Sequence, residues 1–155
     1  MLASVKNSKI RAGAASFAII ASRYNARFVD SMVKSAERQL QKAGAKTIRT
    51  IRVPGAFEIP AVAARLARAN PPYSAVICLG VIIRGQTTHA QQIGDAVSAA
   101  LAQLQIQHAL PIIHEVLLLE NEEQAVVRCL DKKHNRGIEA AQTALEMARI
   151  MNSLD

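Results

Sequence analysis

The sequence lacks several features that mark particular classes of protein. Its 155 residues include no Trp, 3% aromatic residues and two cysteines, and its apolar runs are too short to span a bilayer. The shortage of aromatics argues against a stacking surface for single-stranded nucleic acid, and two isolated cysteines argue against a disulfide framework. Residues 1–13 contain no continuous apolar stretch of the kind found in secretory signals. We therefore expect a cytoplasmic protein with neither a membrane nor a nucleic acid as its partner.

Motifs for several common chemistries are also missing. The chain has no G-x-x-x-x-G-K-[ST] phosphate loop, no G-x-G-x-x-G fingerprint, no H-E-x-x-H and no G-x-S-x-G. The four histidines are dispersed and the two cysteines are far apart. We therefore predict no metal site, and nucleoside triphosphate chemistry is disfavoured.

Acidic residues are scarce near the N-terminus. Residues 1–55 carry eleven Lys and Arg against two Asp and Glu, whereas residues 56–155 carry eight against ten. Several of the cations recur at helical spacing, which favours a solvated helix face over a site for a polyanion. They are Lys34, Arg38, Lys42 and Lys46. The length and the 50% hydrophobic content predict one domain over residues 1–155, with residues 1–13 as an extended N-terminal segment.

Short apolar runs alternate with longer helical patterns along the chain. Strands are predicted over residues 16–22, 47–53, 75–83 and 111–119, and helices over about 26–43, 60–69, 88–105, 121–130 and 137–151. Asn25 is a candidate N-cap, Gly44 a candidate C-terminal stop, and Thr88 with Gln91 has the form of a capping box. Strands separated by helices require parallel crossovers. The pattern therefore predicts an α/β three-layer sandwich, with a four-stranded parallel, flavodoxin-like sheet between two helical layers.

The segments that follow the strands carry the candidate site, because ligands of open parallel sheets bind beyond the carboxyl ends of the strands. They offer the aromatic rings of Tyr24 and Phe57, the carboxylate of Glu58 and the imidazole of His89 at a helix start. The helix dipole favours a neutral imidazole there and attracts an anion. Arg128, on the helix after the fourth strand, could reach a phosphate. Taken singly, each residue also has a structural explanation: His89 could cap the helix, Glu58 could be a charge in the first helical turn, and Arg128 could be a solvated arginine on a helix. Together they suit a flat heterocycle and a small anion.

Longer motifs connect these segments to a known family. The chain contains R-Y-N at 23–25, V-P-G-A-F-E-I-P at 53–60, L-G-V-I-I-R-G-Q-T-T-H at 79–89, E-Q-A at 123–125 and N-R-G-I-E-A-A at 135–141. In this order and over about residues 17–151 they resemble the 6,7-dimethyl-8-ribityllumazine synthase family of riboflavin biosynthesis. The resemblance implies condensation of 5-amino-6-(D-ribitylamino)uracil with 3,4-dihydroxy-2-butanone 4-phosphate, with release of phosphate and water and without a cofactor.

The resemblance also implies a role for each matching residue. His89 is the expected general acid and base. Tyr24, Ala56, Phe57, Glu58, Val81, Ile82, Ile83 and His114 are expected to bind the ribitylaminouracil, while Gln86, Thr87 and Arg128 are expected to bind the phosphate substrate. Family members form homopentamers with active sites between subunits, often assembled as icosahedral shells of sixty subunits, and are linked functionally to riboflavin synthase. His114 and Arg128 are then expected to come from the neighbouring subunit.

Some positions depart from the family pattern. Tyr24 replaces the commoner Phe, His114-Glu115 stands where Phe-Gly is usual, Arg136 replaces Lys, and His134 replaces a common Gly. The His114-Glu115 pair keeps open a second hypothesis, a lumazine- or flavin-binding or shell-forming relative with weakened turnover. A phospho-receiver on the same topology is excluded, because the chain has no acidic cluster after the first strand and no Asp after the third.

Overall fold

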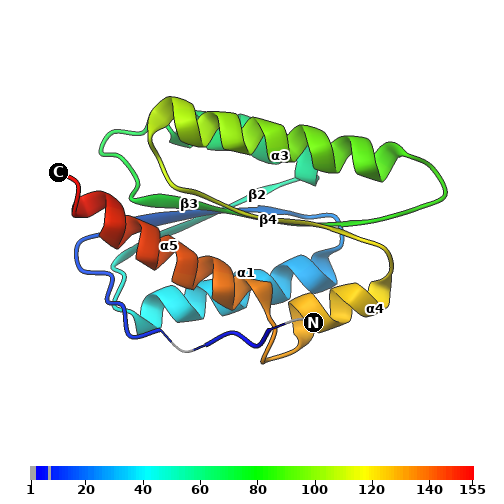
Figure 1. Ribbon diagram of the computed structural model, residues 1–155, viewed down its shortest axis with the longest axis horizontal. Coiled ribbons are helices and arrows are strands. Elements are labelled where there is room, and N and C mark those ends of the chain that lie inside the picture. The colour runs from blue at the N-terminus through cyan, green and yellow to red at the C-terminus, as the bar shows by residue number, and fades with distance from the viewer. Residues whose placement is uncertain (1–2, 7) are drawn as a thin grey trace.

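The computed structural model describes residues 3–6 and 8–155, and it has a parallel four-stranded sheet at its centre (Figure 1). The strand order is β2-β1-β3-β4, with every neighbouring pair parallel. The predicted α/β sandwich is therefore confirmed. The strands are β1 (Ser16–Ser22), β2 (Thr47–Val53), β3 (Ala75–Ile83) and β4 (Ile112–Leu119); the helical elements are α1 (Ala26–Lys42), η1 (Ala56–Glu58), α2 (Ile59–Leu66), α3 (His89–His108), α4 (Glu122–Ala125), η2 (Val126–Leu130) and α5 (Arg136–Asn152).

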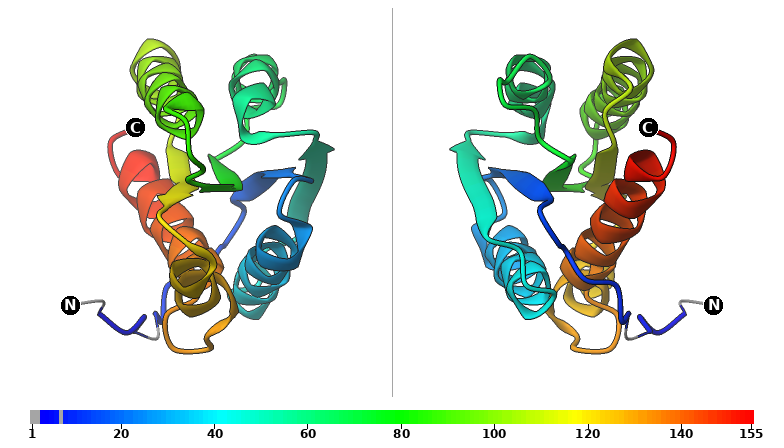
Figure 2. Two further views of the ribbon diagram at one scale, coloured as in Figure 1. Left: turned by 90° about the vertical axis from the view of Figure 1, so that its right-hand side faces the viewer. Right: turned by 90° about the vertical axis from the view of Figure 1, so that its left-hand side faces the viewer.

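Each face of the sheet carries its own apolar core. Alternate residues of a strand point to opposite faces, so Ile19 packs with α1 and α5 while Ile20 packs with α2 and α3. Figure 2 shows these two helical layers on either side of the sheet. Both central strands are covered on both faces, which explains why their sequences are continuously apolar rather than alternating.

Helix α1 follows the predicted pattern, with Phe28, Met32 and Leu40 buried against the sheet. Its end is also as expected. Gly44 has φ +88° and its amide donates to the Gln41 carbonyl, while the Ala45 amide reaches back to the Leu40 carbonyl. This is a Schellman termination, and only glycine adopts that positive φ without strain.

Other helix boundaries differ from the prediction. Helix α2 ends at Leu66, and residues 67–69 close it with tighter turns. Helix α3 continues to His108 before Ala109 turns into the left-handed region at φ +48°. The helix predicted over 121–130 is divided into α4 and the π-helical turn η2. Propensity does not distinguish these outcomes, because they depend on how the last carbonyls of each helix find donors.

The segment 1–13 was predicted to be extended. Its described part forms no helix or strand, and residues 1, 2 and 7 lie outside the described residues. Four hydrogen bonds attach the described part of the segment to the body. The amides of Val5 and Ala12 donate to the carbonyls of Lys133 and Ala43, Arg11 Nη1 donates to the Lys42 carbonyl, and Gln142 Nε2 donates to the Lys6 carbonyl. It therefore runs along the helical layer formed by α1 and α5.

Candidate active site

A cavity of about 640 Å³ lies beyond the carboxyl ends of β1, β2 and β3 and is bounded by the first turns of α3. It brings together eight of the predicted site residues from four separate segments of the chain. They are Tyr24, Ala56, Phe57, Glu58, Val81, Ile82, Ile83 and His89. Asn25, Gly55, Gln92, Ile93 and Ala96 complete the lining.

Two aromatic rings stand at this cavity with most of their surface in solvent. The exposed fraction is 68% for Tyr24 and 61% for Phe57, whereas Phe17 and Phe28 are buried in the core. Exposed aromatic side chains around a concavity are typical of a binding surface. Gly55 makes room for one ring, because a Cβ there would lie 2.9 Å from the Tyr24 ring. A side chain at this position of the V-P-G-A-F-E-I-P motif would therefore displace the Tyr24 ring from its place at the site.

The carboxylate of Glu58 is held in place by the turn that carries it. Its Oε2 atom accepts a hydrogen bond of 2.8 Å from the Gly55 amide, which fixes the side chain at the start of η1. One carboxylate oxygen is therefore committed to the backbone, and Oε1 is available to a ligand hydroxyl. In this geometry Glu58 can fill both roles that its sequence position suggests, as a charge in the first helical turn and as a group that binds a ligand.

Asn25 lines the site, although its position in the sequence predicts only a helix cap. Its backbone is left-handed at φ 58°, and its side chain makes no capping bond. Instead, Nδ2 donates 2.7 Å to the carbonyl oxygen of Val81 in β3. This bond ties the turn after β1 to the end of β3, and therefore places Tyr24 relative to the backbone of residues 81–83. The position of Asn25 inside the R-Y-N motif was the signal for this role.

The loop before α3 carries three of the predicted residues. His89 lines the cavity, while Gln86 and Thr87 lie on the exposed part of the loop and do not. The Thr87 hydroxyl accepts a 3.4 Å hydrogen bond from the His89 amide. At helix N-termini such amides lack intrahelical partners and suit an anion.

The capping box predicted for Thr88 and Gln91 is wrong. Thr88 has helical dihedral angles and makes no side-chain cap. Gln91 instead accepts from Arg84 at 2.7 Å, and Arg84 also pairs with Glu120 at 3.1 Å. These contacts anchor the loop to the end of β4, a longer-range attachment that outcompetes the local cap.

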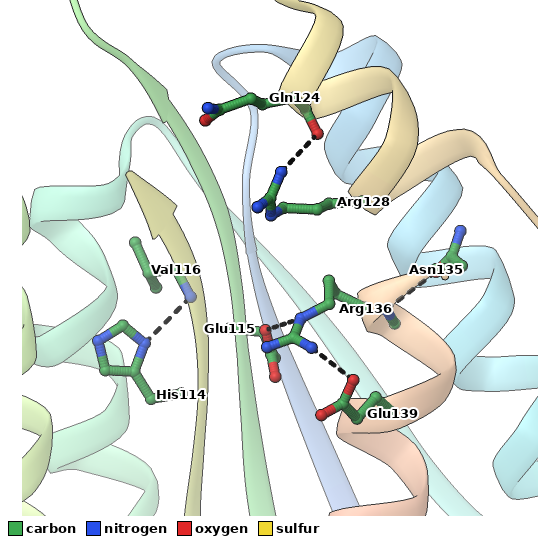
Figure 3. A network of polar contacts seen from close by, with 9 residues as sticks. His114, Glu115, Val116, Gln124, Arg128, Asn135, Arg136 and Glu139 are labelled. Carbon is green, nitrogen blue, oxygen red and sulfur yellow. Dashed lines mark hydrogen bonds and ion pairs between the residues drawn. The ribbon is translucent and has the colours of Figure 1, made fainter. Parts of the chain in front are cut away.

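His114 lies away from the cavity, on the α3 side of β4 (Figure 3). Its Nδ1 accepts from the Val116 amide at 3.1 Å, so the neutral ring carries its proton on Nε2 and donates it to Ser98 Oγ at 2.7 Å. Burial lowers the pKa of His114, an effect that an interaction with the backbone of His114 itself only partly offsets. The ring is therefore fixed in one tautomer on the exposed edge strand.

Arg128 also lies outside the cavity. It is half-buried on the π-helical turn η2, where one guanidinium nitrogen is 3.5 Å from the Gln124 carbonyl oxygen (Figure 3). A π-helical turn interrupts the regular spacing of an α-helix, and such turns are frequent at functional sites. The cavity of one chain thus includes neither His114 nor Arg128. Their contribution from a neighbouring subunit stays a prediction.

Glu115 is a buried acid that has no role in the sequence analysis. It points to the opposite side of β4 from His114 (Figure 3). Arg136 Nε lies 3.3 Å from its Oε2, but the same guanidinium also binds Glu139 at 2.6 Å. Burial raises the pKa of Glu115 to about 7, although Arg136 opposes the change. One arginine shared by two carboxylates does not compensate the desolvation of the buried one.

Glu115→Gln is expected to remove a pH dependence of stability. Between its ordinary pKa of 4.5 and about 7, Glu115 holds a proton in the folded state that the unfolded chain has lost. The free energy of unfolding of the wild type should therefore fall as pH rises through this window, by ~3 kcal/mol at most. Above pH 7 the variant should be the more stable protein, as measured by urea denaturation at fixed protein concentration.

The exposed Glu123 provides a matched control for this comparison. The profile of a Glu123→Gln variant should run parallel to that of the wild type. If Glu115→Gln also runs parallel, the assignment to Glu115 is incorrect.

Comparison with known proteins decides among the interpretations of this site. A family model described as 6,7-dimethyl-8-ribityllumazine synthase matches residues 14–152. The chain belongs to this family. Two bacterial proteins named 6,7-dimethyl-8-ribityllumazine synthase, from Stenotrophomonas maltophilia and Desulfotalea psychrophila, are 41% identical over 142 residues and 40% identical over 147. These alignments cover 90% and 94% of the chain, and 91% and 94% of the relatives.

Two further findings concern the helices and the cysteines of this lumazine synthase family member. Within residues 3–6 and 8–155, no helix has the length and apolarity to cross a membrane. Both cysteines are free thiols in the interior, and burial raises the pKa of Cys78 and of Cys129 to about 12. Neither thiol is therefore suited to act as a nucleophile near neutral pH.

Proposed function

We propose that this protein condenses 5-amino-6-(D-ribitylamino)uracil with 3,4-dihydroxy-2-butanone 4-phosphate to 6,7-dimethyl-8-ribityllumazine, releasing phosphate and water. Its family and the names of its relatives support this transferase activity. The observation that carries the proposal is the cavity itself, which gathers eight residues of the family motifs at the carboxyl edge of the sheet. The reaction uses neither a metal nor an organic cofactor in this proposal.

The ribitylaminouracil would lie between the two aromatic residues and the end of β3. Tyr24 offers an exposed face on which the pyrimidine can stack, and the bond from Asn25 to Val81 fixes that face relative to the strand. Ile82 and Ile83 would meet the pyrimidine through backbone groups. Ala56, Phe57 and the free oxygen of Glu58 would hold the ribityl chain.

The phosphate substrate would bind at the start of α3. Gln86 and Thr87 would contact the phosphate there, and Arg128 would complete the clamp with charge-assisted hydrogen bonds. His89 directly follows this loop at the start of α3 and lines the cavity. It would move protons during formation of the Schiff base and loss of phosphate, acting as general acid and base.

The proposed assembly is a homopentamer in which a neighbouring subunit supplies His114 and Arg128. Both lie outside the cavity of their own chain, and the η2 turn that carries Arg128 also exposes Val126 and Val127, with 39% and 42% of their surface accessible. Twelve such pentamers would form a shell of sixty subunits.

We also propose a functional link to riboflavin synthase and a cytoplasmic location. The reduced thiols of Cys78 and Cys129 suit that compartment.

A lumazine- or flavin-binding relative with weakened turnover is not favoured. The relatives that match almost the whole chain are named as synthases. The His114-Glu115 pair that suggested this alternative does not alter the part of the cavity that its own chain lines.

Mixing both substrates with the protein tests the proposed function. We expect the lumazine absorbance to rise faster than in the spontaneous reaction, in proportion to protein concentration. Light scattering on the same sample should report a mass of five subunits or a multiple of it. Tight flavin binding without any rise above background, in correctly assembled protein, would establish the carrier function instead.

A further inference from the structure

A second cavity, of about 710 Å³, lies in the helical layer formed by α1 and α5. One wall is the outer face of α1 and the other is the segment from the end of η2 to the start of α5. Figures 1 and 2 show these elements side by side on one face of the sheet. We call this cavity the basic cleft; its lining is Arg27, Asp30, Ser31, Lys34, Ser35, Arg38, Leu130, Lys132, Asn135 and Ile138.

The basic cleft carries four cationic side chains and a single acidic one. Arg27, Lys34 and Arg38 lie along α1, and Lys132 faces them from the opposite wall. Asp30 is already paired with Arg52 of β2. Among the described residues, none of the four cations has a carboxylate partner within 4.0 Å. Within the part of the chain that the structure describes, the cleft therefore carries an excess of positive charge.

The two walls of the basic cleft are held rigidly together. Ser31 Oγ donates 2.6 Å to the Cys129 carbonyl, and the buried Asn135 donates 2.6 Å to the same oxygen. Behind them, α5 approaches α1 so closely that a Cβ on Gly137 would lie 2.1 Å from the Met32 carbonyl oxygen. A fixed spacing between the walls reduces the ordering cost of binding a ligand between them.

We propose that the basic cleft binds the oligophosphate group of a small anionic ligand. Lys34 and Arg38 are one helical turn apart, which separates them by about 6 Å along the axis, and Lys132 lies across the cleft. A di- or triphosphate offers several charged oxygens along its length, which these three cations can share. Guanidinium and ammonium groups form strong charge-assisted bonds with such oxygens. The half-buried Ser35 adds a hydroxyl to the same wall.

This site is separate from the proposed substrate phosphate site. The basic cleft and the cavity around His89 share no lining residue, and Arg128 belongs to neither lining. The proposal also gives a function to the positive charge near the N-terminus, since three of the four cations lie within residues 1–55. The sequence alone favoured a solvated helix face for these residues, because the wall that faces α1 comes from residues 130–138.

Titration calorimetry of the full-length protein with inorganic tripolyphosphate tests the proposal. We expect saturable binding of one ligand per chain that weakens as salt rises from 50 to 500 mM, as expected of exposed charges. Arg38→Ala and Lys132→Ala should each weaken binding about 10-fold. Both side chains are exposed, so circular dichroism should show unchanged folding. A nucleoside triphosphate measured in parallel tells whether a nucleoside adds affinity or the phosphates alone are recognised.

Two control variants separate this site from its alternatives. Lys46 is an exposed cation outside the basic cleft, and Lys46→Ala should change the affinity less than twofold. Arg128→Ala should retain tripolyphosphate binding, because that arginine belongs to the other proposed site. Absence of saturable binding, equal losses in all the lysine and arginine variants, or loss only in Arg128→Ala would each overturn the proposal. None of these results depends on lumazine formation, so the proposed activity is tested independently.

Discussion

Replacing His89 with alanine is expected to lower kcat about 100-fold, near the low end of the usual effect of a general acid and base. The expected loss is at the low end because condensation of these substrates also proceeds unassisted. His89 begins α3 and lines the cavity, but the residue is exposed and is not part of either apolar core. The substitution should therefore affect proton transfer without unfolding the protein. Steady-state kinetics with each substrate varied in turn measure the effect.

Arg128→Ala provides the contrasting variant. Loss of its guanidinium should raise KM for the phosphate substrate and leave KM for the ribitylaminouracil nearly unchanged. In His89→Ala the change should fall on kcat, and the pH dependence of kcat should flatten. If His89→Ala instead raises only KM, or if the wild-type and variant pH profiles coincide, His89 has a binding role and not the proposed catalytic one.

The sheet and its helical layers could be predicted from local pattern. The strand β3 is continuously apolar, which indicates cover on both faces, and Gly44 follows the last apolar residue of α1 at the position of a helix stop. Both signals depend on neighbours within a few residues in sequence. The parallel direction of the strands followed from the helices between them, because parallel strands require such crossovers.

Competing side-chain hydrogen bonds and contacts between distant segments account for what the sequence did not predict. Gln91 has the right spacing to cap α3, but Arg84 and Asp95 occupy its side chain instead. Asn25 precedes α1 like a cap, but its amide bonds to β3. For both residues another partner competes with the capping bond, and sequence spacing does not rank the two. The basic cleft was missed because its walls are almost a hundred residues apart in the chain.

Gly137→Ala is expected to destabilise the protein by about 3 kcal/mol or more, the upper range for an overpacked interior. The added methyl group would lie 2.1 Å from the Met32 carbonyl oxygen and 2.7 Å from its Cα. These are backbone atoms of α1, which is packed on the sheet, so no side chain can rotate away to relieve the overlap. The first turn of α5 would have to move, and with it the N-cap bond from the Gly137 amide to Asn135. Urea denaturation should show a lower midpoint.

Gly94→Ala is the matched control, because it also adds one methyl group to a helical glycine. The nearest atom to a Cβ at Gly94 is Leu118 Cδ2 at 3.4 Å, an ordinary contact with the end of a flexible side chain. Alanine is also favoured over glycine within a helix by about 1 kcal/mol. This variant should therefore be as stable as the wild type or more stable. If Gly137→Ala is instead as stable as Gly94→Ala, the α1–α5 approach is looser than 2.1 Å implies, and the walls of the basic cleft are then not rigid.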